Sequence, residues 1–111
     1  MTDRITALRA LERAVEAGRV GAGLNAVSVF GDNQTAMDAV DAFYGSWDAA
    51  KSVHDAELPG WVGSVDTDGF ARIFRPGPVI TVMETVRLDG MTSRAWLLAI
   101  IRAIIAQEGG E

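Results

Sequence analysis

The single histidine of the chain, His54, is the first residue to consider for chemistry. Lys51 and Asp55 lie near it on an expected helix, so an acid–base site built from these three residues is one interpretation. A catalytic triad also needs a nucleophile and an orienting carboxylate in matched geometry, and the sequence does not indicate them. The sequence favours the alternative, a histidine on a partly exposed helix surface.

Two short motifs resemble ligand-binding loops. Residues 66–69 read Asp-Thr-Asp-Gly, like the start of a calcium loop, but Gly77 stands where such a loop needs an acidic ligand. Gly18, Gly21 and Gly23 follow an expected helix, whereas a dinucleotide-binding loop follows a strand, and the Gly-Lys of a phosphate-binding loop is absent. We therefore expect a hairpin turn at 66–69, a plain loop after residue 18, and neither metal nor cofactor.

Three arginines are stronger candidates for ligand binding. Arg72 and Arg75 lie on one expected strand and Arg87 lies late in the next, so the three could gather near a sheet edge. Alternation along a strand places Arg72 on the same face as Phe70 and Phe74, and Arg75 on the opposite face. Arginine beside aromatic rings suits phosphates and nucleobases, through forked hydrogen bonds and stacking. Charged residues also protect edge strands against aggregation, and that alternative stays open.

The large aromatic residues divide into expected core and expected surface. Trp96 lies in a very apolar helix, so we expect it in the core. Trp47 directly follows a helix-capping serine, so we expect it to be exposed and available to a partner. Tyr44 and Trp47 therefore join the arginines and His54 as candidate ligand-binding residues.

Length and composition indicate one domain over residues 1–111. The hydrophobic fraction is 49% and the charged fraction is 23%, which suffices for a single core. The chain has no cysteine, which excludes disulfides, zinc–thiolate sites and thiol catalysis and fits a reducing compartment. The net charge of −5, with dispersed basic residues, argues against duplex nucleic-acid binding. It permits a small anion in a local arginine cluster, or a basic protein surface as partner.

The chain ends and the apolar stretches indicate no membrane association. The first residues contain no apolar signal segment. The most apolar stretch, residues 95–106, includes Arg102 and falls short of the roughly 20 residues that a membrane span needs. We therefore expect a cytoplasmic protein.

Helical periodicity and capping residues predict three helices before residue 60. The first begins after Thr2 or Asp3 and ends near Gly18. Four glycines interrupt residues 18–34, so we expect a flexible connection there, with a short strand or turn at 26–30. A second helix runs over 35–44 with Met37 pointing inward, and a third runs over 47–57.

The second half changes to a period of two and then returns to helix. We expect strands at 61–65, 70–75 and 79–88, followed by a helix that starts at residue 92 or 93 and ends near residue 107. The predicted fold is therefore α+β, a three-stranded antiparallel β-meander packed with N-terminal, middle and C-terminal helices. The last helix is apolar nearly all round, which predicts a central position or a surface shared with a second subunit, hence a homo-oligomer.

Three segments resemble a known family. They are residues 41–51 (Asp-Ala-Phe-Tyr-Gly-Ser-Trp-Asp-Ala-Ala-Lys), 58–61 (Leu-Pro-Gly-Trp) and 93–103 (Ser-Arg-Ala-Trp-Leu-Leu-Ala-Ile-Ile-Arg-Ala). Together they resemble phage ABA-sandwich domain proteins of the alphaproteobacterial phage type, over residues 41–107. Gly63 departs from the family pattern, which often has an aromatic residue there. The resemblance implies a phage setting in a host cytoplasm, and it implies no particular chemistry.

These observations lead to three hypotheses for function. The first is a non-enzymatic phage accessory protein that counters host defence by sequestering a small nucleotide at a subunit interface. The second is an acidic inhibitor that blocks a host defence protein, or else a structural or lysogeny accessory of the phage. The third is a small hydrolase or isomerase that uses His54 with Asp55.

Overall fold

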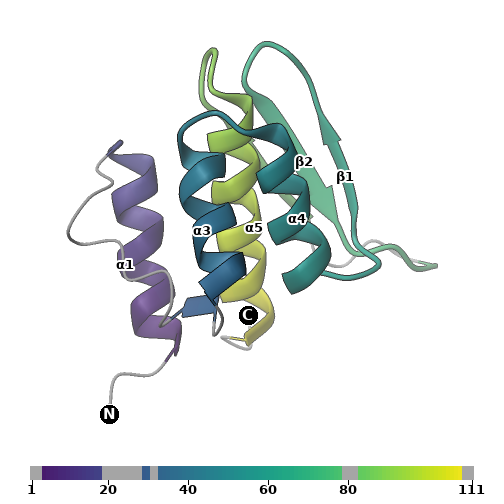
Figure 1. Cartoon of the computed structure of the whole chain (residues 1–111). Helices are drawn as coiled ribbons and strands as arrows, with labels where there is room; N and C mark the ends of the chain where they lie inside the picture. The colour runs from purple at the N-terminus through teal and green to yellow at the C-terminus, as the bar shows by residue number, and fades with distance from the viewer. Residues whose placement is uncertain (1–3, 19–28, 31–32, 79–82, 109–111) are drawn as a thin grey trace.

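The computed structural model describes residues 4–18, 29–30, 33–78 and 83–108 (Figure 1). Helices come first along the chain, a three-stranded sheet follows, and a long helix comes last. The helices are α1 (Arg4–Glu16), α3 (Asn33–Phe43), α4 (Trp47–Glu57) and α5 (Thr92–Glu108). The strands are β1 (Val62–Val65), β2 (Phe70–Phe74) and β3 (Met83–Arg87), antiparallel and in the order β1-β2-β3. The predicted α+β meander is therefore confirmed.

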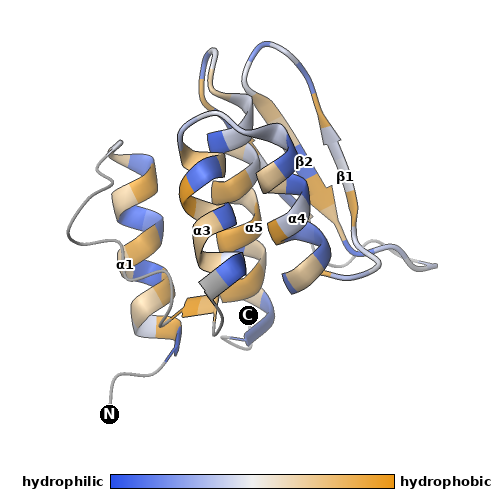
Figure 2. Ribbon diagram, in the orientation of Figure 1, coloured by the Kyte–Doolittle hydropathy of each residue, from blue (hydrophilic) through white to orange (hydrophobic). Residues whose placement is uncertain are grey.

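Helix α5 lies at the centre of the fold. It contacts α1, α3 and α4 on one side and the strands β2 and β3 on the other (Figure 1). Its residues Leu97, Leu98, Ile100 and Ile101 are at most 1% exposed, and Figure 2 shows that apolar residues dominate the helix between its ends. The same chain therefore covers this helix on its several sides. The apolar surface of α5 accordingly gives no reason to expect a second subunit.

The two faces of the sheet differ in what covers them. The inner face carries Ala71, Ile73 and Val86, which are at most 5% exposed because α5 packs against β2 and β3. The alternate residues of the strands point to the outer face. Among the described residues, no helix packs against this outer face (Figure 1).

The middle helices α3 and α4 begin at or near their predicted first residues and pack through small side chains. The Ser46 hydroxyl accepts a hydrogen bond from the Ala49 N–H at 3.1 Å, which starts α4 at Trp47 as predicted. Helix α3 begins two residues before the predicted Thr35. The prediction that Met37 points inward is wrong, because this side chain is 62% exposed. The buried positions of α3 include its three alanines, at 36, 39 and 42, which leave room for α4 and α5 to approach closely.

The predicted turn at 66–69 joins β1 to β2 and also anchors α5. Asp66 Oδ1 accepts a hydrogen bond from the Asp68 N–H at 2.8 Å, which is the typical role of aspartate in a turn. Thr92 Oγ1 accepts one from the Gly69 N–H at 3.0 Å. Gly69 has a φ of +98°, and a Cβ added there would lie 1.9 Å from the carbonyl oxygen of Leu88. Only glycine fits this position.

Two predicted segments, at 26–30 and 79–88, lie only partly within the described residues. The short strand or turn at 26–30 is wrong at Val29 and Phe30, which have helical backbone and are buried; residues 26–28 lie outside the described residues. The predicted third strand begins at Met83, and its first part, residues 79–82, also lies outside them. No helix in the described part of the chain has the length and apolar character to cross a membrane.

Arg4 joins the ends of three helices. Its guanidinium forms ion pairs with Glu57 at the end of α4 and with Glu108 at the end of α5, and its Nε donates to the Val29 carbonyl oxygen at 2.7 Å. Positive charge is favourable at helix C-termini because the helix dipole is negative there. Arg4 therefore ties α1 to α4 and α5.

Candidate functional site

The outer face of the sheet brings together several residues that the sequence singles out. Phe70, Arg72 and Phe74 of β2 share this face, as strand alternation predicts. The Arg72 guanidinium carbon lies 5.3 Å from the centre of the Phe70 ring, within cation–π distance. Arg87 is the cross-strand partner of Phe70, so it lies on the same face. The Phe70 ring thus has an arginine along its own strand and another on the neighbouring strand.

An apolar row crosses the outer face near the other end of β2. Val62 of β1 and Met83 of β3 are the cross-strand partners of Phe74, and they are 42% and 46% exposed. Phe70 and Phe74 are half-buried, but neither belongs to the hydrophobic core or packs against it. A solvated sheet face normally carries polar residues, so these exposed apolar side chains indicate a binding surface.

The strands place two arginines on the outer face of an acidic protein. Its strand residues include Arg72 and Arg87 and no carboxylate, whereas the whole chain has a net charge of −5. Within the described part of the chain, no carboxylate pairs with Arg72. The Arg87 Nε donates to Asp89 at 3.1 Å, but these side chains are 67% and 87% exposed, so the pair is weak and a ligand anion can compete for it. The face therefore suits an anionic ligand.

Arg75 does not join the other two arginines in the sheet. Strand β2 ends at Phe74, so Arg75 lies one residue beyond the paired region and is exposed there. Strand alternation, the reason for placing Arg75 on the opposite face, therefore does not apply to it.

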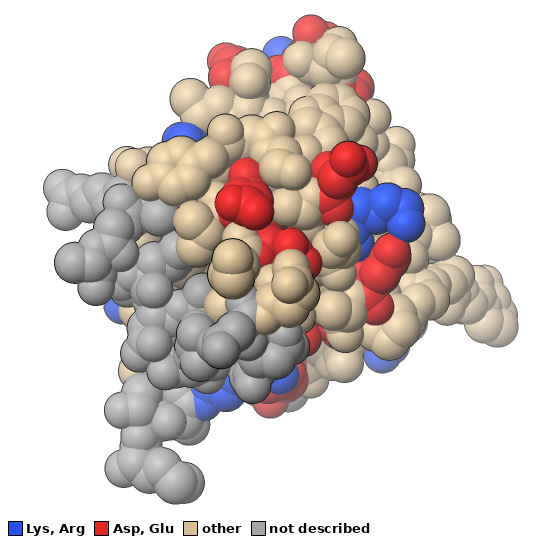
Figure 3. Space-filling view, viewed as in Figure 1, with Lys and Arg blue, Asp and Glu red and all other residues tan. Residues whose placement is uncertain are grey.

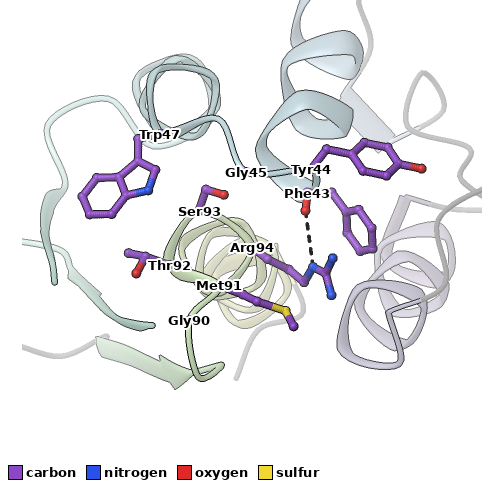
Figure 4. Close-up of a pocket in the computed structure, with 9 residues that line it drawn as sticks. All are labelled: Phe43, Tyr44, Gly45, Trp47, Gly90, Met91, Thr92, Ser93 and Arg94. Atoms are coloured by element: carbon purple, nitrogen blue, oxygen red, sulfur yellow. Dashed lines mark hydrogen bonds between the residues drawn. The ribbon is translucent and has the colours of Figure 1, made fainter. Parts of the chain in front are cut away.

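A second candidate site is a hollow of about 230 Å³ between the α3–α4 turn and the start of α5 (Figure 4). Tyr44 and Trp47 line it, and they are 69% and 42% exposed, which agrees with the predicted exposure of Trp47. In Figure 4 the two rings lie on opposite sides of the hollow, and the Tyr44 ring points away from Trp47. The volume is below the roughly 300–1,000 Å³ of small-molecule pockets. The hollow is therefore better suited to contact with a protein than to enclosing a nucleotide.

Arg94 lines the same hollow and is missing from the sequence-based candidates. Its guanidinium carbon lies 3.9 Å from the centre of the Phe43 ring, and its Nε donates to the Phe43 carbonyl oxygen at 3.3 Å (Figure 4). The sequence does contain a signal for it, because Arg94 is the one charged residue in the first turns of an otherwise apolar helix.

His54 lies in the protein interior, which corrects the expected position on a partly exposed helix surface. It is 4% exposed, and its Nδ1 and Nε2 lie 3.1 Å from Trp96 Nε1 and 2.9 Å from the Trp61 carbonyl oxygen. An indole N–H can only donate, so Nδ1 accepts, and Nε2 carries the proton and donates to Trp61. Lys51 and Asp55 form an exposed ion pair with each other at 2.8 Å. His54 therefore has a structural role, and the acid–base interpretation lacks an accessible imidazole.

Helices α3 and α4 carry an acidic surface on the side that faces away from the sheet. Asp41, Asp48 and Asp55 of these helices are exposed, and Figure 3 shows carboxylates distributed over both helices. The exposed Tyr44 and Trp47 lie at the junction of the same two helices. We call these five residues the acidic helix face.

A charged cluster joins β3 to α1 and α5. Arg102 of α5 forms ion pairs with Glu12 at 3.0 Å and Glu16 at 2.6 Å. Burial raises the pKa of the Glu84 carboxyl; the Arg102 charge acts against this rise, and the Glu12 charge adds to it. The internal pairing of these charges indicates a structural cluster.

In the comparisons with known proteins, no protein-family model matches the chain, and neither a curated protein nor a solved structure does. The resemblance to phage ABA-sandwich proteins therefore stays a prediction. The outer sheet face and the acidic helix face are the surfaces from which a function can be inferred.

Proposed function

We propose that the protein is a non-enzymatic binding protein that holds a small nucleotide on the outer face of the sheet. The observation that carries this proposal is the Phe70 ring, which lies outside the core with Arg72 beside it and Arg87 across from it. A nucleobase stacks on an aromatic ring whatever its hydrogen-bonding pattern. Arginine binds phosphate through two parallel hydrogen bonds. One residue trio thus offers both contacts that a nucleotide needs.

The phage resemblance gives this binding activity a setting. A phage accessory protein in the host cytoplasm would counter host defence by removing a nucleotide signal from solution. The outer face is open, so a second copy could close over the bound nucleotide, and this face would then replace α5 as the surface shared between subunits. Sedimentation of the protein with and without nucleotide measures this directly, and a mass of one chain in both samples contradicts it.

A thermal-shift titration with a panel of mononucleotides and cyclic nucleotides tests the proposal. A ligand at about 100 times its dissociation constant adds roughly 2.7 kcal/mol to the free energy of unfolding. Replacing Arg72 by glutamine should remove the ligand-induced shift. Arg13→Gln, an exposed change on α1, is the charge-matched control and should keep it. No shift with any nucleotide would contradict the proposal.

The acidic helix face supports a second candidate, an inhibitor that blocks a basic surface of a host protein. Its exposed tyrosine and tryptophan are the residue types that dominate binding energies at protein interfaces. Its carboxylates would steer a basic partner and make the association rate depend on salt. Pull-down from host extract with the wild type and with Trp47→Ala tests this candidate. A partner retained equally by the variant excludes this face.

A further inference from the structure

The outer sheet face has a second ring that a mononucleotide bound at Phe70 leaves unused. Phe74 lies four residues further along β2 on the same face, between its exposed neighbours Val62 and Met83. At about 3.4 Å per residue of an antiparallel strand, the two phenylalanines are roughly 14 Å apart. Arg72 lies midway between them. The face therefore alternates aromatic, cationic and aromatic positions along a single strand.

We infer that the ligand carries two nucleobases joined through phosphate, one base on Phe70 and the other on Phe74, with the joining phosphate at Arg72. This inference rests on the proposed function and extends it from one nucleobase to two. Neighbouring stacked bases are about 3.4 Å apart, so one stacked pair cannot reach both rings. The ligand is therefore extended along β2. A free dinucleotide and a segment of single-stranded nucleic acid share this chemistry.

Charge complementarity favours this ligand over an apolar partner. An apolar chain laid along β2 would bury the Arg72 guanidinium, for which the described residues offer no counter-charge, and burial of an unpaired charge is costly. A phosphate at the same position pairs with the guanidinium instead. The flanking Val62 and Met83 side chains can contact the edges of a base stacked on Phe74. Each part of the two-base ligand thus has a matching side chain on the face.

The test compares binding of adenosine monophosphate, the dinucleotide ApA and an oligoadenylate to the full chain by calorimetry. The wild type should bind ApA more tightly than the monophosphate. Loss of one stacking ring costs about 5- to 150-fold in affinity. Phe74→Ala should therefore weaken ApA binding by that factor and leave monophosphate binding unchanged. Phe74→Leu keeps an apolar side chain if the alanine variant does not fold, and Met37→Ala on α3 is the control.

The outcomes separate this inference from the function beneath it. Equal affinities for the monophosphate and ApA, with no effect of either Phe74 variant, overturn the two-base ligand and leave nucleotide binding intact. Absence of binding by all three probes overturns both. A further gain in affinity with oligoadenylate supports the two-base site as part of a strand-binding surface. The same affinity for ApA and oligoadenylate supports it as a site for a free dinucleotide.

Discussion

Replacing His54 by leucine should destabilise the protein by about 2–3 kcal/mol. The change removes the acceptor of the Trp96 N–H, 3.1 Å away, and the donor to the Trp61 carbonyl oxygen, 2.9 Å away. A buried polar group left without a partner costs about 1–3 kcal/mol. Trp61 and Trp96 are half-buried, so water reaches them in part and each loss falls near the lower end of this range. The melting temperature should fall by about 10 °C.

Urea unfolding followed by far-UV circular dichroism measures this effect without relying on the fluorescence of the affected tryptophans. Trp96→Phe removes the N–H instead of its acceptor, and the double variant isolates the energy of the pair. The double variant should lose less stability than the two single variants added together, because no unpaired N–H remains. A change within about 0.5 kcal/mol for His54→Leu, the range of surface substitutions, would refute the structural role of this residue.

Three further predictions concern the turn, the core and the charged cluster. Gly69→Ala should lower the free energy of unfolding in urea by about 3 kcal/mol or more, because the added Cβ meets the Leu88 carbonyl oxygen and the φ of this residue is positive. A decrease below about 1 kcal/mol would contradict the turn geometry. Ile101→Ala should cost about 2–5 kcal/mol in the same assay, because this fully buried side chain leaves a cavity, and an effect typical of surface positions would contradict its burial. Because the pKa of the Glu84 carboxyl is raised in the folded state, its contribution to stability is present in acid and is lost as the pH rises through the folded-state pKa. The variant Glu84→Gln should therefore be more stable than the wild type at pH 8, and the difference in stability should be smaller at pH 4. Equal differences at both pH values would argue against burial of this carboxyl.

Local signals in the sequence were sufficient to predict most of the fold. The capping serine at 46, the turn at 66–69 and the apolar run of α5 each act within a few residues, and each appears in the structure where the sequence places it. The inward position predicted for Met37 in α3 was wrong, because the alanines of this helix pack inward and Met37 does not. A methionine weighs more than an alanine in a hydrophobicity pattern, although the smaller residue is the one that lets two helices approach.

The candidate site depends more on long-range pairing, which the sequence does not display. Alternation along β2 predicted that Phe70 and Arg72 share a face, since both residues lie on one strand. The apolar row of Val62, Phe74 and Met83 depends on the register of both strand pairs and could not be found from a single strand. The burial of His54 likewise depends on a partner 42 residues away.

The central position of α5 has a consequence for how this protein acquires its structure. Residues 92–108 supply the surface against which α1, α3, α4, β2 and β3 are packed, yet the ribosome makes them after all five of these elements. The preceding helices and the sheet would expose the apolar sides that α5 normally covers until that segment emerges. Folding of this domain is therefore expected to follow the emergence of α5 from the ribosomal exit tunnel, with no stable native-like core on the nascent chain before that moment.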